Sequence, residues 1–482
     1  MKSVFSKLIK FTLFCFLLFL NAETSSARDI RVRLSNASKY SINSTGNITL
    51  TDSKNKSHSI GKSPTLSISK GTVTSGKNKY SLPVTLKSSN PLGFNGRKYR
   101  GTLRISKDGE LINMLNVEDY LRGVLKAEAS PNWPMEYLKV QAIVSRTYAT
   151  RESLAAKSRG YDVTDSTSSQ VYHGMNAETP RTDQAVRETK DKVLTYGNEL
   201  AFTPFHSDSG GATANNADVW GQDLPYLRSV KEPMAYKSPN SSWEARISSN
   251  ELSTAINKVS PNLGAIKDIK VINTDKFGRT VNLRITGSTS SATIKASTLR
   301  TAIGPNKLKS TFLVLPEANA IKQVPANSPI TEKKAPVNPR TEARETPSIN
   351  VNTNEEMTPQ EDALLSQLFS EGAFTNSEMM EILLKPEKRK EYLNRAIAKG
   401  NSPQPEKDTK KPPVDIGNEP ITEGASIPFS NGHFIFRGKG WGHGVGMSQY
   451  GAMNLANSGW NAERILNHYF PGTIVKTATA KR

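Results

Sequence analysis

The sequence predicts an α+β protein with a mixed α/β core, a β-rich N-terminal part and a partly disordered insertion. Three observations predict it. Short alternating runs dominate the first hundred residues, apolar residues at helical spacing begin near position 116, and a Pro-, Lys-, Glu- and Thr-rich tract interrupts the chain between positions 317 and 426. Blocks of strands and blocks of helices that follow one another, without regular alternation, favour an α+β fold.

Residues 1–27 have the layout of a secretory signal peptide. Lys2, Lys7 and Lys10 precede an apolar run over residues 11–20. The run is shorter than the about 20 residues of a membrane span, so export and cleavage are expected. The protein should therefore be extracytoplasmic, in the periplasm, the cell wall or the medium, and membrane-anchored if the signal is not cleaved. Cys15, the only cysteine, lies in this run, so the mature chain should lack disulfides, cysteine ligands and a cysteine nucleophile.

The chain carries a formal net charge of +20 over 482 residues. A strongly basic protein is attracted to anionic surfaces, which outside the cytoplasm are wall polymers, acidic peptides or lipid headgroups. No nucleic-acid-binding motif is present, so we expect no nucleic-acid partner.

Residues 28–106 form the predicted β-rich part. The runs 30–34 and 80–84 alternate apolar and polar residues, and turn signals separate such runs. No cluster of ionisable residues in this part suggests chemistry.

Residues 107–316 begin the core, with helical spacing from Asn116. One apolar stripe consists of Tyr120, Leu121, Val124 and Leu125. A second helix should start at Pro134 and end near Leu154. Strands are expected around residues 193–196 and 269–272.

Residues 317–426 are predicted to be an insertion with one helical island. Thr358, Pro359 and Glu361 form a capping box, while the flanking arms have disordered composition. A strand at 434–436 follows, so residues 427–476 should complete the core, and 477–482 form a tail.

The segment 438–451 combines five glycines at alternate positions with retained aromatic and polar residues. These include Trp441, His443, Gln449 and Tyr450. Glycine allows close approach of another chain or a ligand, so we expect a folded loop that presents these side chains. The alternative is a tight structural turn before an amphipathic stretch over 452–469. A P-loop is disfavoured, because its Gly-Lys-Ser/Thr end is missing.

Glu128 is placed at the hinge between the two predicted helices, near a helix N-terminus and Trp133. The aromatic wall would raise the pKa of the carboxyl group and the helix end would lower it. An ordinary helix-end glutamate is the alternative. Lys139 and Arg146 are seven residues apart and should share one helix face, as a solvated stripe or as the lining of an anionic or polar cleft.

Residues 205–211 contain an Asp-Ser-Gly-Gly sequence that is similar to a serine-protease nucleophile segment, but the surrounding motifs are missing. His206, Ser207 and Ser209 are therefore interpreted as polar lining residues of a glycine-ended loop. A zinc hydrolase is also disfavoured, because the histidines are not at ligand spacing.

Taken together, five segments resemble the SpoIID/LytB family of bacterial sporulation and wall-remodelling proteins. They are residues 111–128, 134–148, 165–172, 205–211 and 438–472. The resemblance implies a peptidoglycan lytic transglycosylase with Glu128 as the catalytic glutamate, Lys139 and Arg146 as essential helix cations, and the two glycine-rich loops as cleft walls. Some members carry a zinc-binding cysteine pair where this chain has residues 162–172 without cysteine, so no metal and no soluble cofactor are expected.

A lytic transglycosylase cleaves the MurNAc–GlcNAc bond of peptidoglycan strands without water and leaves 1,6-anhydro-MurNAc ends. One carboxyl group suffices, which would be Glu128. Lys139 and Arg146 would orient it or hold substrate, and glycan would be bound by His206, Ser207, Ser209, Trp441, His443, Gln449 and Tyr450. One alternative is a non-catalytic amidase enhancer, whose partner would be a wall amidase. The other is a hydrolytic glycosidase, which needs a second carboxylate from Asp165, Asp208 or Asp218.

Overall fold

The computed structural model describes residues 29–156, 160–234, 236–315, 389–398 and 424–478, which form two compact units. Of the described residues, the first unit comprises 29–131, 145–156, 160–194 and 475–478, and the second comprises 132–144, 195–234, 236–315, 389–398 and 424–474. The predicted core is thus shared between the units. The α+β prediction is confirmed. The expected signal peptide and the helical island at Thr358 lie outside the described residues.

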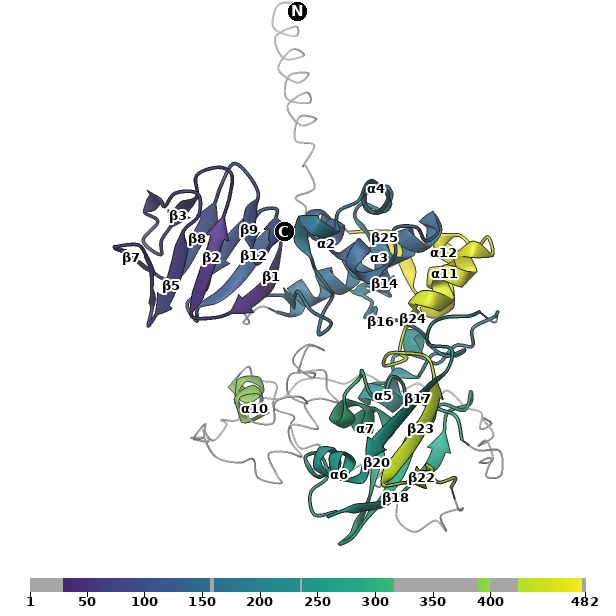
Figure 1. Ribbon diagram of the computed structural model, residues 1–482. Helices are drawn as coiled ribbons and strands as arrows, with labels where there is room; N and C mark the ends of the chain where they lie inside the picture. Colours follow the sequence, from purple (N-terminus) through teal and green to yellow (C-terminus); the bar gives the residue numbers. More distant parts are fainter. Residues whose placement is uncertain (1–28, 157–159, 235, 316–388, 399–423, 479–482) are drawn as a thin grey trace, which may run out of the picture. The chain divides into compact units, whose positions relative to one another are not determined.

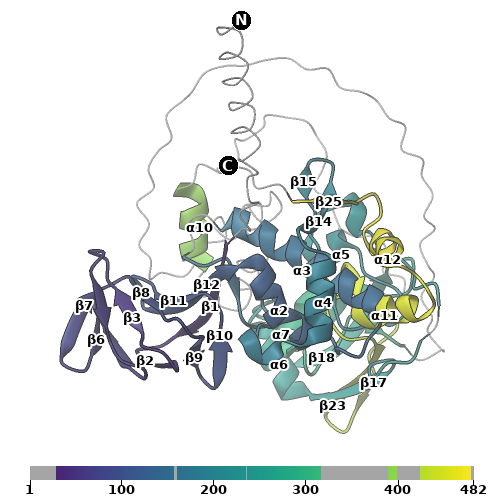
Figure 2. The ribbon, with the colours of Figure 1, turned by 90° about the horizontal axis from the view of Figure 1, so that it is seen from above.

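Two sheets make up the N-terminal part of the first unit (Figures 1 and 2). The seven-stranded sheet has the order β13 (Val163–Thr164), β1 (Asp29–Asn36), β12 (Glu110–Asn116), β11 (Thr102–Ile105), β8 (Val84–Lys87), β3 (Thr49–Thr51) and β4 (Ser57–Ser59). The six-stranded sheet has the order β10 (Arg97–Tyr99), β9 (Leu92–Phe94), β2 (Lys39–Asn43), β5 (Thr65–Ser69), β6 (Thr72–Ser75) and β7 (Asn78–Ser81). Each sheet buries one face, with Leu50, Leu66, Val73 and Leu86 fully covered, as the alternating runs predicted.

The predicted run 80–84 is not one strand. Tyr80 lies in β7 of the six-stranded sheet, whereas Val84 is the first residue of β8 in the seven-stranded sheet. Pro83 lies between them and has no backbone N–H for a ladder, so the chain changes sheets there.

The helices of the first unit follow the sheets. They are α2 (Val117–Glu128), the C-terminal part of α3 (Met135–Ala155), the 3₁₀ helix η1 (Gly174–Ala177) and α4 (Pro180–Glu188). Asn116 caps the N-terminus of helix α2, because its side chain accepts a hydrogen bond from the Glu118 N–H. The predicted apolar stripe of α2 is buried. Residues 140–150 of α3 are buried on all sides, so this helix is not a surface helix with a solvated stripe.

The second unit is built on two small sheets. One contains β17 (Trp243–Ser248), β23 (His433–Lys439) and β21 (Phe312–Leu313), with β22 (Phe429–Ser430) paired to β23; the other contains β18 (Ile266–Thr274), β19 (Thr280–Gly287) and β20 (Ser291–Lys295). They share a core with α6 (Ser249–Asn257) and α7 (Ala296–Ile303). The strands predicted at 269–272 and 434–436 are confirmed. Because β23 follows the predicted insertion and pairs with β17 before it, the fold closes only near the C-terminus.

Short elements complete the two units. They are β14 (Lys192–Tyr196), β15 (Glu199–Leu200), β16 (Phe205–His206), α5 (Asn216–Trp220), η2 (Pro225–Leu227), α10 (Arg389–Ala398), β24 (Met447–Ser448), α11 (Gln449–Asn457), α12 (Ala462–Tyr469) and β25 (Ile474–Thr477). The amphipathic stretch expected over 452–469 is two helices, because Gly459 takes a φ of 84° and Asn461 caps α12. No helix of the described part of the chain is long and apolar enough to cross a bilayer.

Candidate functional site

Glu128 is the last residue of α2, and its half-buried carboxylate is anchored by the backbone. Its Oε1 accepts a hydrogen bond of 2.7 Å from the Val171 N–H. The carboxylate therefore lies at the C-terminal end of its own helix, where the helix dipole disfavours a negative charge. The anchoring N–H compensates for this in part, because it binds the charged form.

The loop that anchors Glu128 is held tightly against α2. Gln170 is fully buried, accepts a hydrogen bond of 3.1 Å from the Tyr120 hydroxyl and donates to the Ser145 carbonyl. The Tyr172 hydroxyl donates to Asn113 at 2.8 Å, and its ring packs so closely on Gly123 that a Cβ there would collide with it. Burial raises the pKa of both tyrosines well above the usual range. They therefore stay neutral and serve as fixed parts of the wall behind Glu128.

Asp165 belongs to the same unit as Glu128. Its carboxylate lies 3.6 Å from Arg97 and is 26 % exposed, and burial raises its pKa. Among the three aspartates considered as a second carboxylate, Asp165 alone lies in the unit that contains Glu128.

Arg146 is buried, and hydrogen bonds use all of its donors. It forms a bidentate ion pair with Glu118, in which Nε and Nη2 each lie 2.7 Å from a carboxylate oxygen. Its remaining N–H groups donate to the carbonyls of Val186 and Lys192 and to the Thr189 hydroxyl. A guanidinium has five N–H donors. Because none is left over, the structure favours a supporting role for Arg146 in place of the predicted substrate contact.

Lys139 lies on the part of α3 that belongs to the second unit. Its Nζ is 3.0 Å from Glu136, whose other oxygen accepts a hydrogen bond of 2.8 Å from the Ala462 N–H at the start of α12. Lys139 and Arg146 thus belong to different units, and the shared face predicted from their spacing does not give them a shared environment.

The second unit contains two glycine-rich segments, residues 205–211 and 438–451, which pack directly on each other. Strand β16 pairs with β24, and isolated bridges join Asp208 to Trp441 and Ala214 to Val445. Gly440, Gly442, Gly444 and Gly446 all have positive φ. A Cβ at Gly440 or Gly446 would collide with backbone of the facing segment, which only glycine avoids. The segment is the folded loop that we expected and extends beyond a single tight turn.

His206 and His443 meet where the two segments pack, with ring centroids 5.4 Å apart. His206 Nδ1 lies 3.1 Å from the Val445 carbonyl and His443 Nε2 lies 3.1 Å from the Phe205 carbonyl, so both nitrogens act as donors. Burial lowers the pKa of His206 well below its usual range and that of His443 to about 3. Both rings are therefore neutral and hold the loops together. The His206 Nε2 atom is buried without a partner among the described residues.

Ser209 is fully buried in a network that centres on Glu232. Its hydroxyl donates to Glu232 at 3.0 Å, and the Tyr469 hydroxyl donates to the other carboxylate oxygen at 2.7 Å. Burial raises the pKa of Glu232 to about 7. Ser209 therefore links the glycine-ended loop to α12 and is not accessible to a polymer. No sequence pattern around Glu232 indicated this role, since the contact joins segments distant in the chain.

Asp208 is also buried and fully engaged. One oxygen accepts hydrogen bonds from the Gly210 N–H and the Tyr236 hydroxyl, and the other accepts from Ser238. It therefore cannot serve as the second carboxylate of a hydrolase.

Trp441 is the most accessible of the predicted C-terminal site residues. It is 37 % exposed, and the Lys309 ammonium lies 5.3 Å from its ring centroid. Tyr450 is partly exposed and packs edge-on against Trp133 at 5.3 Å. Gln449 is 8 % exposed and its amide lies 3.5 Å from Gln141. Ser207 is partly exposed, and its carbonyl accepts the Tyr450 N–H. Trp441, Tyr450 and Ser207 can reach a ligand, whereas Gln449 is a packing residue.

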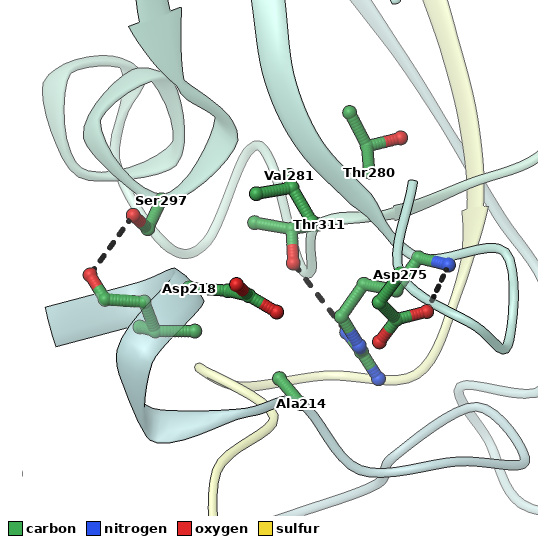
Figure 3. Close-up of a pocket in the computed structure, with 9 residues that line it drawn as sticks. Ala214, Asp218, Asp275, Thr280, Val281, Ser297 and Thr311 are labelled. Carbon is green, nitrogen blue, oxygen red and sulfur yellow. Dashed lines mark hydrogen bonds between the residues drawn. The ribbon is translucent and has the colours of Figure 1, made fainter. Parts of the chain in front are cut away.

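Asp218 is the last of the three aspartates considered as a second carboxylate. It lines a small polar pocket of the second unit (Figure 3). Asp275 and Arg279 line the same pocket, and Arg279 also donates to the carbonyls of Ser209 and Ala212. The buried guanidinium thereby supports the glycine-ended loop. Among the residues that the structure describes, no three metal-ligating side chains gather in one place.

Residues 106–196 match the family model of the Stage II sporulation protein, SpoIID. The chain carries a SpoIID domain. The family resemblance is thereby confirmed, and the matched range contains Glu128, Lys139 and Arg146 but neither glycine-rich segment.

Three relatives extend the similarity. An uncharacterized protein of Brachyspira hyodysenteriae is 30 % identical over 235 residues, which is 48 % of this chain and 62 % of the relative. The amidase enhancer of Bacillus subtilis is 24 % identical over 398 residues, 82 % of this chain and 46 % of the relative. The stage II sporulation protein D of Bacillus subtilis is 34 % identical over 143 residues, 27 % of this chain and 42 % of the relative. The chain thus spans between 42 % and 62 % of the length of these relatives.

Proposed function

We propose that this SpoIID-domain protein acts on the bacterial cell wall as a peptidoglycan lytic transglycosylase, in wall remodelling or in sporulation-type wall degradation. The observation that supports the proposal best is the half-buried Glu128 carboxylate, which lies inside the SpoIID match and is oriented by the Val171 N–H at 2.7 Å. A carboxyl group held in one orientation by rigid neighbours is what positioned proton transfer requires.

In the proposed reaction Glu128 performs both proton transfers. It first donates its proton to the glycosidic oxygen between MurNAc and GlcNAc, so that the bond from this oxygen to MurNAc C1 breaks and GlcNAc leaves as an alcohol. The resulting carboxylate then takes the proton of the MurNAc C6 hydroxyl as the C6 oxygen bonds to C1, which restores the protonated Glu128. The C6 hydroxyl belongs to the same sugar, so its effective concentration far exceeds that of an external nucleophile. No second carboxylate is required.

The second unit would supply glycan contacts. Trp441 offers an exposed aromatic face, and Tyr450 and Ser207 offer accessible polar groups. Peptidoglycan strands are then the substrate, and the protein works outside the cytoplasm, as the expected signal peptide over residues 1–27 implies.

A non-catalytic amidase enhancer is the second candidate. It is favoured by the similarity to the Bacillus subtilis amidase enhancer over 82 % of this chain. It is also favoured by the burial of Arg146, His206, Ser209 and Gln449, which removes four predicted site residues from contact with a ligand. In this case the protein would bind wall glycan and stimulate a wall amidase.

Mass spectrometry of purified glycan after digestion tests the proposal. The wild type should produce 1,6-anhydro-MurNAc ends, and Glu128→Gln should abolish them, because the amide cannot exchange the proton. Glu199→Gln removes an exposed carboxylate of β15 and should leave product formation unchanged.

Two other outcomes would overturn the proposal. Reducing ends that disappear in Asp165→Asn would identify a hydrolase with Asp165 as its second carboxylate. Intact glycan, together with stimulation of an added wall amidase that Glu128→Gln retains, would identify an enhancer.

A further inference from the structure

The N-terminal strands carry more than half of the net charge of the chain. Residues 29–116 contain 15 Lys and Arg against 4 Asp and Glu, a net charge of +11 out of +20. This part of the first unit makes up less than a fifth of the sequence. Its positive charge is therefore concentrated.

Arginines and lysines of this region behave differently. Four of the five arginines are ion-paired, namely Arg31 with Asp162, Arg33 with Glu110, Arg97 with Asp165 and Arg100 with Glu178. The ten lysines are all exposed and form no ion pair with any described residue; they are Lys39, Lys54, Lys56, Lys62, Lys70, Lys77, Lys79, Lys87, Lys98 and Lys107. The arginines stabilise the fold, and the lysine charges remain available to a partner.

Three of these lysines lie on one face of the six-stranded sheet. The strand register places Lys39, Ser67, Thr74 and Lys79 in a row across β2, β5, β6 and β7. A second row contains Asn43, Gly93 and Lys98 across β2, β9 and β10. Directly paired residues point to the same side of a sheet, and positions i and i+2 of a strand do so as well. Lys39, Lys79 and Lys98 therefore share the outer face.

The same face is covered with hydroxyl groups and has no acidic residue. Ser41, Thr65, Ser67, Ser69, Thr72, Thr74 and Ser81 alternate with the buried residues of the strands. Figure 1 shows β2, β5 and β7 in this sheet. Lys39 and Lys79 are three strand spacings apart, or about 14 Å. This outer surface, called here the lysine face, is lined by uncharged hydroxyl groups and carries lysines near both edges of the sheet.

We propose that the lysine face binds peptide-bearing peptidoglycan, with the stem-peptide carboxylates paired to Lys39, Lys79 and Lys98. This inference rests on the proposed function for one point only, which is that the bound polymer is peptidoglycan. The lysine face would hold the protein on the wall independently of Glu128.

The chemistry of the face favours this occupant. A lysine ammonium is a point charge on a flexible stem, so it pairs with carboxylates at irregular positions, whereas arginine requires a fixed planar geometry. Serine and threonine hydroxyls both donate and accept hydrogen bonds, which suits the hydroxyl and amide groups of a glycopeptide. The absence of acidic residues on the face removes repulsion of the carboxylates.

Co-sedimentation of the whole protein with purified sacculi tests the proposal. The triple variant Lys39→Gln, Lys79→Gln and Lys98→Gln should bind about tenfold more weakly at low salt, since each exposed ion pair contributes little alone. The control Lys258→Gln, Lys267→Gln and Lys276→Gln removes three exposed lysines of the second unit and should bind like the wild type. Circular dichroism confirms that each variant is folded.

Chemical amidation of the sacculus carboxylates gives the decisive comparison. Wild-type binding should fall to the level of the triple variant, and the triple variant should be little affected. Equal losses in both triple variants would show only a general charge effect and overturn the proposal. Binding that survives amidation but is lost when hydrofluoric acid removes phosphodiester-linked polymers would assign the face to a phosphate polymer instead. A protein that binds as expected but forms no anhydro ends would refute the lytic activity alone.

Discussion

Replacing Arg146 by alanine should destabilise the protein strongly, because the side chain is 1 % exposed and makes five hydrogen bonds. The change would leave the Glu118 carboxylate, which is 16 % exposed, without its counter-ion, and would leave the Val186 carbonyl without this donor. Breaking a buried ion pair on one side costs about 3–5 kcal/mol. For a unit of this size that corresponds to a fall in melting temperature of about 10 °C.

Thermal and urea denaturation, followed by circular dichroism, measure this loss. Arg187→Ala is the matched control, because Arg187 is an exposed arginine in the last turn of α4. We expect it to change the free energy of unfolding by less than about 0.5 kcal/mol. The double variant Arg146→Met with Glu118→Leu should recover much of the stability, since no unpaired charge remains.

Enzyme assays on the same variants separate support from substrate binding. If Arg146 is structural, Arg146→Ala should lose wall activity in proportion to its loss of folded protein, and the double variant should regain both. An Arg146→Ala protein that melts like the wild type but has lost glycan binding or cleavage would refute the supporting role.

Two further predictions concern the second unit. Burial raises the pKa of Glu232 from 4.5 to about 7, so the stability that this residue gives the fold at low pH is lost as the pH rises towards 7. Urea denaturation at pH 5 and pH 8 should show this loss in the wild type. In Glu232→Gln the difference in unfolding free energy between the two pH values should be smaller by about 3 kcal/mol. If the variant shows the same pH dependence as the wild type, Glu232 does not have the raised pKa of a buried carboxyl group. Trp441→Ala should weaken binding to glycan about tenfold without unfolding the protein, as measured by co-sedimentation. Phe429→Ala removes a more exposed ring and should leave binding unchanged.

The strands and the first helices could be predicted from the sequence because local signals determine them. Each N-terminal sheet buries one face, so apolar residues recur at every second position, as in β1. Asn116 marks the start of α2 because its side chain satisfies a free N–H group of the first turn. The break between α11 and α12 was missed, although Gly459 and Asn461 are ordinary signals for a helix end and a helix start.

The partners of the site residues could not be predicted, because residue spacing gives the direction of a side chain but not what covers it. The seven-residue spacing of Lys139 and Arg146 correctly places both on one helix. Yet Arg146 pairs with Glu118 of α2, whereas Lys139 pairs with Glu136, three residues earlier in α3. Ser209 and Ser448 are 239 residues apart in sequence and hydrogen-bonded in the fold. Such contacts have no local signature.

The buried network around Glu232 changes what the two glycine-rich segments mean for function. Ser209, Ser448 and Tyr469 come from three different elements and all surround the Glu232 carboxyl group. Gly451 of α11 packs so close to Glu232 and the Tyr469 hydroxyl that a Cβ there would collide with both. Polar residues and glycines in these motifs are therefore needed to join the loops to α11 and α12. Only the residues that remain accessible after this packing, above all Trp441, can select a ligand, so substitutions at Ser209 or His206 should be interpreted first through their effect on the fold.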